Sequence, residues 1–124
     1  MKNVLIILFI IFISSCSNKV ELIGDWKING FIVNEIKSEI TPNFSPIFFK
    51  TDSLVIYFSQ LNRYSVKSDS IFLYDLENDK MINKMGIEFV DKNNFNLHYT
   101  RYLKNPDNDS IKTIPYESQW TKVN

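Results

Sequence analysis

The side chains that could carry out chemistry in this 124-residue chain are few and widely spaced. His98 is the only histidine and Cys16 is the only cysteine. A transition-metal site usually needs several nitrogen or sulfur ligands, so we expect no metal and no cofactor. No Gly-x-Ser-x-Gly sequence marks a serine nucleophile. His98 alternates with Asn96 and Thr100, which predicts a solvated or lumenal histidine, and we expect the protein not to be an enzyme.

Each of the remaining charged groups has a purely structural interpretation as well as a chemical one. Asp75, Glu77 and Asp79 are spaced like the start of a calcium loop, but the glycine and the bidentate glutamate of such a loop are missing, which favours a hairpin turn. Arg63 and Arg101 are the only arginines, and each lies near tyrosines. Inside a cavity they could pair with the acidic head of a ligand. Facing outward they would stack on a neighbouring ring, and we favour that interpretation.

A pattern of aspartate, serine and an aliphatic residue occurs three times in the chain. It resembles the sequon for general protein O-glycosylation in one group of Gram-negative bacteria. The resemblance implies glycans on the serines of the pattern, which are Ser53, Ser70 and Ser110. An equally good physical explanation is that the aspartate and serine end a turn and the aliphatic residue begins the next strand. Both interpretations stay open at this point.

The first 16 residues form a unit of their own. Residues 4–13 are unbroken apolar residues after Lys2, which is typical of a signal peptide and too short for a membrane span of about 20 residues. Residues 13–16, with the sequence Ile-Ser-Ser-Cys, resemble the lipobox of bacterial lipoproteins. The resemblance implies cleavage after residue 15 and a lipid on Cys16 that anchors the protein in a membrane. The alternatives are an ordinary signal peptide with a chance cysteine, or a short membrane anchor.

The mature chain would comprise residues 16–124, with 13 basic and 14 acidic residues once Lys2 is removed. This balance gives no reason to expect nucleic acid as a partner. The length suits one domain, and packing alone must hold it because no cysteine follows Cys16. The chain has no alanine and 15% aromatic residues, which favours strands. We therefore predict a tether at residues 16–21 and one β domain at residues 22–124.

Short alternating runs separated by turn residues predict about seven antiparallel strands. They cover residues 22–32, 54–58, 63–67, 71–76, 81–90, 95–103 and 116–123. In the first run, Trp26, Ile28 and Ile32 are expected on one face. Residues 38–50 contain two prolines and are predicted to form an apolar loop that covers part of the domain. Several strands are apolar on both faces, which favours a closed barrel or a two-sheet sandwich.

Residues 22–26, with the sequence Leu-Ile-Gly-Asp-Trp, resemble the Gly-x-Trp signature that opens the first strand of lipocalins. A long loop and a meander of hairpins follow, as in that family. The resemblance implies an all-β antiparallel meander that forms a small lipocalin-like barrel or a partly open barrel. It also implies that Trp26 closes one end of the barrel and that residues 42–50 cover the open end. The candidate ligand-binding or lid residues are Trp26, Phe44, Phe48, Phe49, Arg63 and Arg101.

Two functions from different classes fit these observations. The first is a membrane-anchored lipoprotein whose barrel binds a small apolar or amphipathic ligand, which requires a cavity. The second is an envelope lipoprotein without such a cavity that binds another protein, as an inhibitor or an accessory subunit. In both cases the lipid would hold the protein at the inner or the outer membrane, with the outer favoured. The domain would then lie in the periplasm or at the cell surface.

Overall fold

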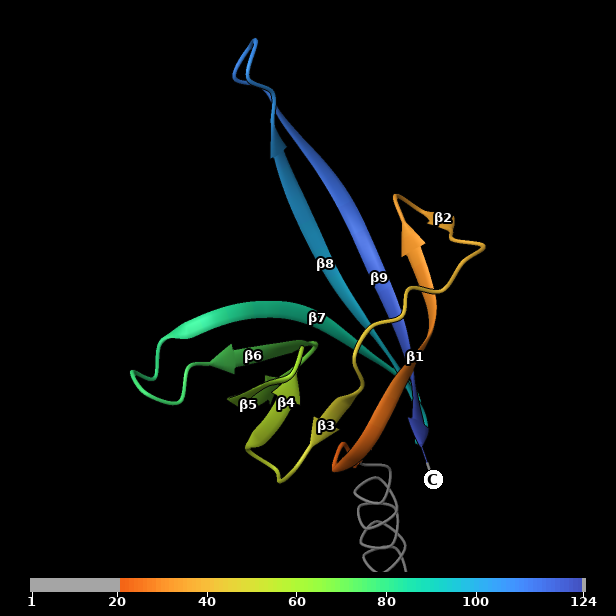
Figure 1. The fold of residues 1–124 in the computed structure, drawn as a ribbon, viewed down its shortest axis with the longest axis vertical. Coiled ribbons are helices and arrows are strands. Elements are labelled where there is room, and N and C mark those ends of the chain that lie inside the picture. The colour runs from red at the N-terminus through yellow and green to blue at the C-terminus, as the bar shows by residue number, and fades with distance from the viewer. Residues whose placement is uncertain (1–20, 124) are drawn as a thin grey trace, which may run out of the picture.

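The computed structural model describes residues 21–123, so the leader and the predicted lipidation of Cys16 lie outside the described residues. The described chain is antiparallel β-structure (Figure 1). Its strands are β1 (Gly24–Val33), β2 (Ile36–Lys37), β3 (Ile47–Phe49), β4 (Leu54–Tyr57), β5 (Gln60–Lys67), β6 (Ser70–Tyr74), β7 (Met81–Asp91), β8 (Asn94–Lys104) and β9 (Ile111–Val123). We find no helix among residues 21–123 with the length and apolar character needed to cross a membrane.

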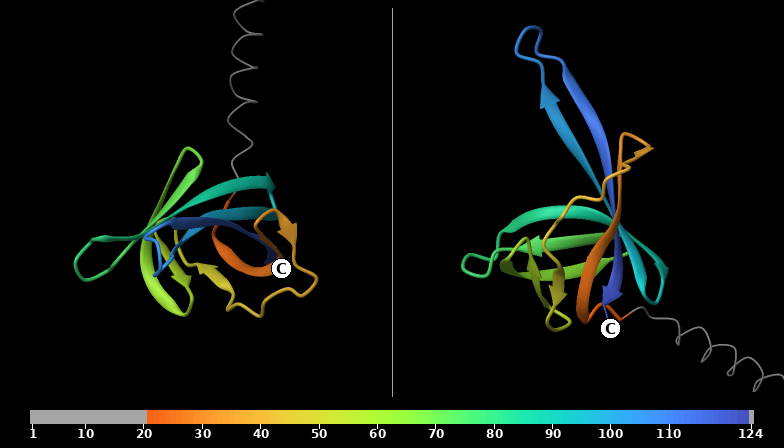
Figure 2. Two further views of the ribbon diagram at one scale, coloured as in Figure 1. Left: turned by 90° about the horizontal axis from the view of Figure 1, so that it is seen from above. Right: turned by 45° about the vertical axis from the view of Figure 1, so that its right-hand side comes forward.

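Eight of the strands close into a barrel. From β3 to β9, each strand pairs with its neighbour in the sequence, and β1 completes the ring by pairing with both β3 and β9. The short strand β2 extends the sheet beside the last two residues of β1. Figure 2 shows the barrel from two further directions. The arrangement confirms the predicted all-β antiparallel meander and its closure into a small barrel.

Part of the predicted loop is a barrel strand. Residues 47–49 form β3, and Ile47 and Phe49 point into the barrel with 1% and 3% of their surface exposed. The prediction of a loop over residues 38–50 is therefore wrong for this segment. Three residues are too few to show alternation in a sequence, but pairing of Ile47 with Trp26 of β1 completes the barrel wall. The closing strand also begins earlier than predicted, at Ile111 rather than Tyr116.

A β-bulge changes which side chains of β1 face the core. The register between β1 and β9 shifts between Ile28 and Gly30. One extra residue in a strand turns the following side chains to the opposite face. Phe31 therefore points inward, opposite Ser118, with 9% of its surface exposed. The prediction that Ile32 shares a face with Trp26 is wrong for this reason.

Side chains of the described residues pack against one another inside the barrel. Trp26 and Phe95 are fully buried, and their ring centroids lie 4.6 Å apart. The indole N–H of Trp26 donates to the carbonyl of Leu22 at 2.8 Å, and that of Trp120 donates to Ser118 Oγ at 2.8 Å. In the described chain, every buried side-chain nitrogen and oxygen has a hydrogen-bond partner. The buried cluster contains Trp26, Ile47, Phe49, Val55, Tyr64, Ile71, Leu73, Met85, Ile87, Phe95, Leu97 and Trp120.

Strands β8 and β9 continue beyond the barrel as a two-stranded hairpin. Pairing of β7 with β8 reaches His98, and pairing of β1 with β9 reaches Tyr116. Beyond these residues, β8 and β9 pair with each other as far as Lys104 and Ile111, the residues on either side of the turn. We call residues 99–116 the arm. Figure 1 shows it extending away from the barrel, and residues 100–113 are all exposed.

Candidate functional site

One face of the arm continues the inner face of the barrel. Side chains alternate along β8, so Phe95 and Leu97 point into the barrel and Tyr99 follows on the same side. Beyond the rim, this side carries Arg101 and Leu103. On β9, Tyr116 lies opposite Tyr99, Ile114 lies opposite Arg101 and Lys112 lies opposite Leu103. The face that packs on the core inside the barrel therefore continues along the arm, where three of its six side chains are exposed and three are half-buried.

Aromatic side chains form a continuous row from the base of the arm across the rim of the barrel. The rings of Tyr99 and Tyr116 stack in parallel, with centroids 5.3 Å apart. Phe31 lies 5.7 Å from Tyr116 and 5.6 Å from Phe44. Phe58, in the turn after β4, lies 5.5 Å from Phe44 and has 51% of its surface exposed. We call the set the aromatic row, and its members are Tyr57, Phe58, Phe44, Phe31, Tyr116 and Tyr99.

The outer part of the arm exposes large apolar side chains. Tyr102 is 70% exposed, Ile111 is 65% exposed and Leu103 is 39% exposed. Along this part of the hairpin, the outer edges of β8 and β9 pair with no other strand of the described chain. Exposed apolar side chains and unpaired strand edges are both typical of surfaces that contact other proteins.

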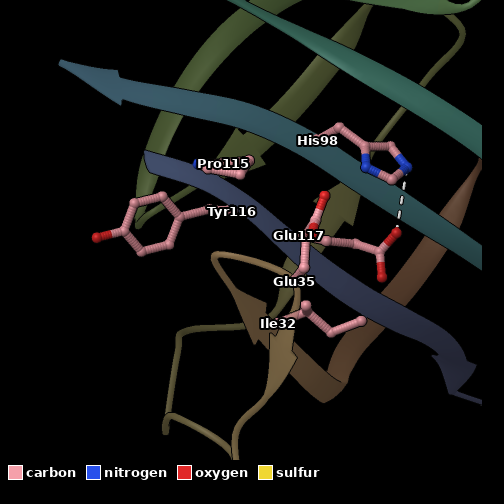
Figure 3. Close-up of a pocket in the computed structure, with 6 residues that line it drawn as sticks. All are labelled: Ile32, Glu35, His98, Pro115, Tyr116 and Glu117. Carbon is pink, nitrogen blue, oxygen red and sulfur yellow. Dashed lines mark ion pairs between the residues drawn. The ribbon is translucent and has the colours of Figure 1, made fainter. Parts of the chain in front are cut away.

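His98 lies on the outside of the barrel between two glutamates. Its Nε2 is 3.4 Å from a carboxylate oxygen of Glu117 on β9, the pair drawn in Figure 3, and 4.0 Å from one of Glu88 on β7. One ligand atom from each of the three residues lies within 4.8 Å of the others. The side chains of His98, Glu88 and Glu117 are 45%, 61% and 19% exposed. We call these three residues the histidine cluster.

Strand register brings the histidine cluster together, and sequence reasoning missed it for that reason. Glu117 lies directly opposite His98 on β9, whereas Gly86 lies opposite His98 on β7 and Glu88 follows on the same face. Gly86 leaves room for the histidine, because a Cβ at this glycine would lie 3.3 Å from the Cβ of His98. The polar alternation around His98 predicted a solvated or lumenal side chain, and the structure places it on the outside of the barrel. It carried no information about which carboxylates the neighbouring strands would supply.

Two shallow hollows flank His98, and both are open to solvent. One has a volume of about 290 Å³ and is lined by Glu117 and Glu35 among others (Figure 3). The other, of about 610 Å³, includes Glu88 and Asp69 in its lining. Among the described residues 21–123, no lysine or arginine lines either hollow. The surroundings of His98 therefore carry carboxylates without a nearby basic side chain in the same lining.

The aromatic residues nominated as ligand-binding or lid residues lie in three different environments. Trp26 and Phe49 belong to the packed core, where 0% and 3% of their surfaces are exposed. Phe44 belongs to the aromatic row at the rim. Phe48 is half-buried on the outside of the barrel, opposite Ile56 of β4. The structure therefore does not bring these four residues together around one space.

The two nominated arginines both lie outside the barrel interior. Arg63 is half-buried on the outer face of β5, opposite Tyr74, and forms an ion pair with Asp79. Asp79 ends the turn before β7, where Asp75 accepts hydrogen bonds from backbone amides as a hairpin turn requires. Arg101 is exposed on the arm. Neither side chain is placed to meet the head of a ligand inside the barrel.

The serines of the repeated Asp-Ser-aliphatic pattern all lie where a turn meets a strand. Ser53 comes directly before β4, Ser70 is the first residue of β6, and Ser110 comes directly before β9. The first and the last are exposed, and Ser70 is half-buried. The turn explanation accounts for all three positions. Glycosylation of these serines stays a prediction.

Burial changes the acid–base behaviour of three tyrosines. It raises the pKa of Tyr57 well above the usual range, and the nearby Tyr99 adds to this effect. The hydroxyl of Tyr57 donates to the sulfur of Met85 at 3.6 Å. Burial also raises the pKa values of Tyr64 and Tyr99. Phenols with raised pKa values stay protonated at neutral pH and are poor general bases, so these residues supply contact area and hydrogen-bond donors.

Comparison with protein-family models, with curated proteins and with solved structures finds no match for this chain. The arm, the aromatic row and the histidine cluster are therefore the features from which a function can be argued.

Proposed function

We propose that the protein is a lipid-anchored envelope protein that binds another protein through its arm and the adjoining aromatic row. The proposal is of a binding protein and not of an enzyme. The observation that carries it is the arm itself, in which residues 100–113 are all exposed. Closure of the barrel does not require β8 and β9 to continue beyond its rim.

The energetics of the arm favour a partner. A two-stranded hairpin is marginally stable in water unless its apolar side chains pack against something. Tyr102 and Ile111 are 70% and 65% exposed, so the free protein leaves this apolar area in water. Tyrosine and arginine are enriched at protein–protein contacts, and Tyr102 and Arg101 both lie on the arm, on opposite faces of the hairpin. A partner could also add a strand to either unpaired edge of the hairpin.

The position of the arm suits a partner that lies away from the anchoring membrane. Asp25, near the start of β1, pairs with Val123 at the end of β9, whereas the arm contains the beginning of β9. The 13 residues of β9 span about 40 Å at about 3.3 Å per residue. Figure 1 shows β1 beginning at the end of the molecule opposite the arm. A lipid on Cys16 would thus place the membrane near the start of β1, with the arm pointing away from it.

The second candidate function is the binding of a small apolar ligand by the barrel. Its support is the closed eight-stranded ring and the partly exposed aromatic row at one end. A ligand inside would have to displace core side chains such as Phe95, which is fully buried. Native mass spectrometry of protein from the host envelope tests this candidate. A reproducible extra mass released by mild unfolding would support the carrier function over the proposed one.

Photo-crosslinking in the native host tests the proposed function. A photoreactive phenylalanine replaces Tyr102 on the arm, and the matched control carries it at Lys92, an exposed residue in the turn between β7 and β8. Asn93 beside this control accepts a hydrogen bond from the amide of Lys122 near the end of β9, so the control lies at the opposite end of the molecule. We expect one discrete crosslinked protein from Tyr102 and none from Lys92. No crosslink from the arm, or the same crosslinks from both positions, would contradict the proposal.

A further inference from the structure

We propose that the histidine cluster is a surface binding site for a divalent transition metal ion, with Zn²⁺ as the reference ion. Glu88, His98 and Glu117 would each supply one ligand atom. This inference is independent of the arm and goes beyond the proposed protein-binding function.

The donor atoms have the chemistry and the spacing that zinc requires. Imidazole nitrogen and carboxylate oxygen are common zinc ligands, with bond lengths of about 2.0–2.2 Å. Two ligands at that distance in a tetrahedron lie about 3.4 Å apart. The Nε2 of His98 is 3.4 Å from Glu117 and 4.0 Å from Glu88. Small side-chain rotations would therefore bring all three atoms to bonding distance, leaving a fourth position for water.

The site is built on the most extensively paired part of the sheet. The three residues come from the adjacent strands β7, β8 and β9, and two neighbouring amides orient the carboxylates. Asn96 donates to a carboxylate oxygen of Glu88 at 2.9 Å, and Gln119 donates to Glu117 at 3.3 Å. Groups that hold the ligands of a metal in place raise its affinity. Few bonds would have to rearrange when an ion binds.

Space and charge at the site both suit a cation. The hollows on either side of His98 leave room for an ion and its water ligands. Two carboxylates balance the charge of a divalent ion, and Glu35 and Asp69 line the same hollows. The imidazole favours zinc, nickel or copper over magnesium or calcium, which prefer oxygen ligands. The side chains are partly exposed, so an ion can enter without opening the barrel.

Metal titration of the full-length protein tests the inference. The tag-free chain is extracted in detergent, freed of metal with a chelator and titrated with Zn²⁺ by calorimetry and with Co²⁺ by visible absorption. His98 is the only histidine, so its imidazole NMR signals report this residue alone. We expect one saturable ion per chain, a shift of these signals on adding Zn²⁺, and the intense absorption of four-coordinate Co²⁺.

Substitutions distinguish this site from other carboxylates. His98→Gln should weaken zinc binding at least about tenfold, because losing even an outer-shell partner of a metal ligand costs about 10–100-fold. Glu117→Gln should also weaken it, while preserving the size of the side chain. The matched control is Glu39→Gln, which removes an exposed carboxylate from the loop before β3 and should leave the affinity unchanged. Absence of binding at millimolar Zn²⁺, or equal binding by the wild type and His98→Gln, would overturn the inference, whatever the crosslinking experiment shows about a protein partner.

Discussion

Truncating Phe95 should reveal whether the barrel interior is a packed core. Phe95 is fully buried, and its ring centroid lies 4.6 Å from that of Trp26 and 6.2 Å from that of Phe49. Replacing a buried phenylalanine with alanine removes its burial and leaves a cavity, which together cost about 3–5 kcal/mol. A domain of this size has a free energy of unfolding of about 5–15 kcal/mol. Phe95→Ala should therefore remove a large part of the stability.

Urea denaturation of protein that begins at Ser17 provides the measurement. Fluorescence can follow unfolding, because Trp26 and Trp120 are the only two tryptophans and both are buried. The milder Phe95→Leu variant should lose about 1–2 kcal/mol and keeps the test usable if the alanine variant does not fold. The control Tyr102→Ala alters a residue that is 70% exposed and should change the free energy of unfolding by no more than about 0.5 kcal/mol.

The free energy of unfolding lost in Phe95→Ala also distinguishes between the two candidate functions. If Phe95 lined an open ligand cavity, its truncation would enlarge existing space and remove few contacts. A loss below about 1 kcal/mol for a folded Phe95→Ala variant would refute the reasoning that the interior is packed. It would favour the small-ligand function over the protein-binding one.

Three further predictions concern stability and modification. Gly24→Ala should lower the free energy of unfolding by about 1–2 kcal/mol, because Gly24 has φ = +135° and an added Cβ would lie 3.0 Å from Cε of Lys122. The control Gly30→Ala should lose less, since Gly30 does not have the positive φ of Gly24 and its added Cβ would meet the end of the Gln119 side chain. Burial raises the pKa of Tyr57 above the value of about 10 that it has in the unfolded chain. The stability linked to this difference is present below about pH 10 and is lost as pH rises above it. Urea midpoints should therefore fall above about pH 10, and they should fall less in Tyr57→Phe. Intact-mass analysis of protein from the native host should show loss of residues 1–15 and a lipid on Cys16, and Cys16→Ser should abolish membrane retention. The same spectra would show glycans as added mass, and a mass equal to lipid plus polypeptide would reject glycosylation of Ser53, Ser70 and Ser110.

The fold was largely predictable from the sequence because short runs of alternating side chains mark most of its strands. Ile71 and Leu73 point inward while Phe72 and Tyr74 lie on the outer face, as the double-sided apolar pattern indicated. The strand β3 was not predictable, because three residues carry no detectable period and two prolines precede them. The change of face at Phe31 was also hidden, since a bulge is defined by the register with a partner strand.

The candidate sites were less predictable, because both depend on where strands end relative to one another. The sequence marks Tyr102 as a strand residue but cannot show that no neighbouring strand reaches it, and Ile111 lies before the predicted start of the closing strand. It predicts a solvated or lumenal His98 without deciding between the two, and Glu88 and Glu117 become its neighbours only because β7 and β9 both pair with β8. In each case the missing information was a relation between distant segments and not a property of the residues themselves.

The pairing of β1 with β9 also determines how the molecule would respond to mechanical force. A partner that pulled on the arm would pull the beginning of β9, while a lipid before residue 21 would hold the beginning of β1. These two antiparallel strands would then be pulled from their opposite ends, which is a shear geometry. The eight residue pairs between Asp25 and Val33 would resist together, instead of opening one after another. The strand pair that closes the barrel would therefore transmit tension between a lipid anchor at Cys16 and a partner bound to the arm, if both are present as proposed.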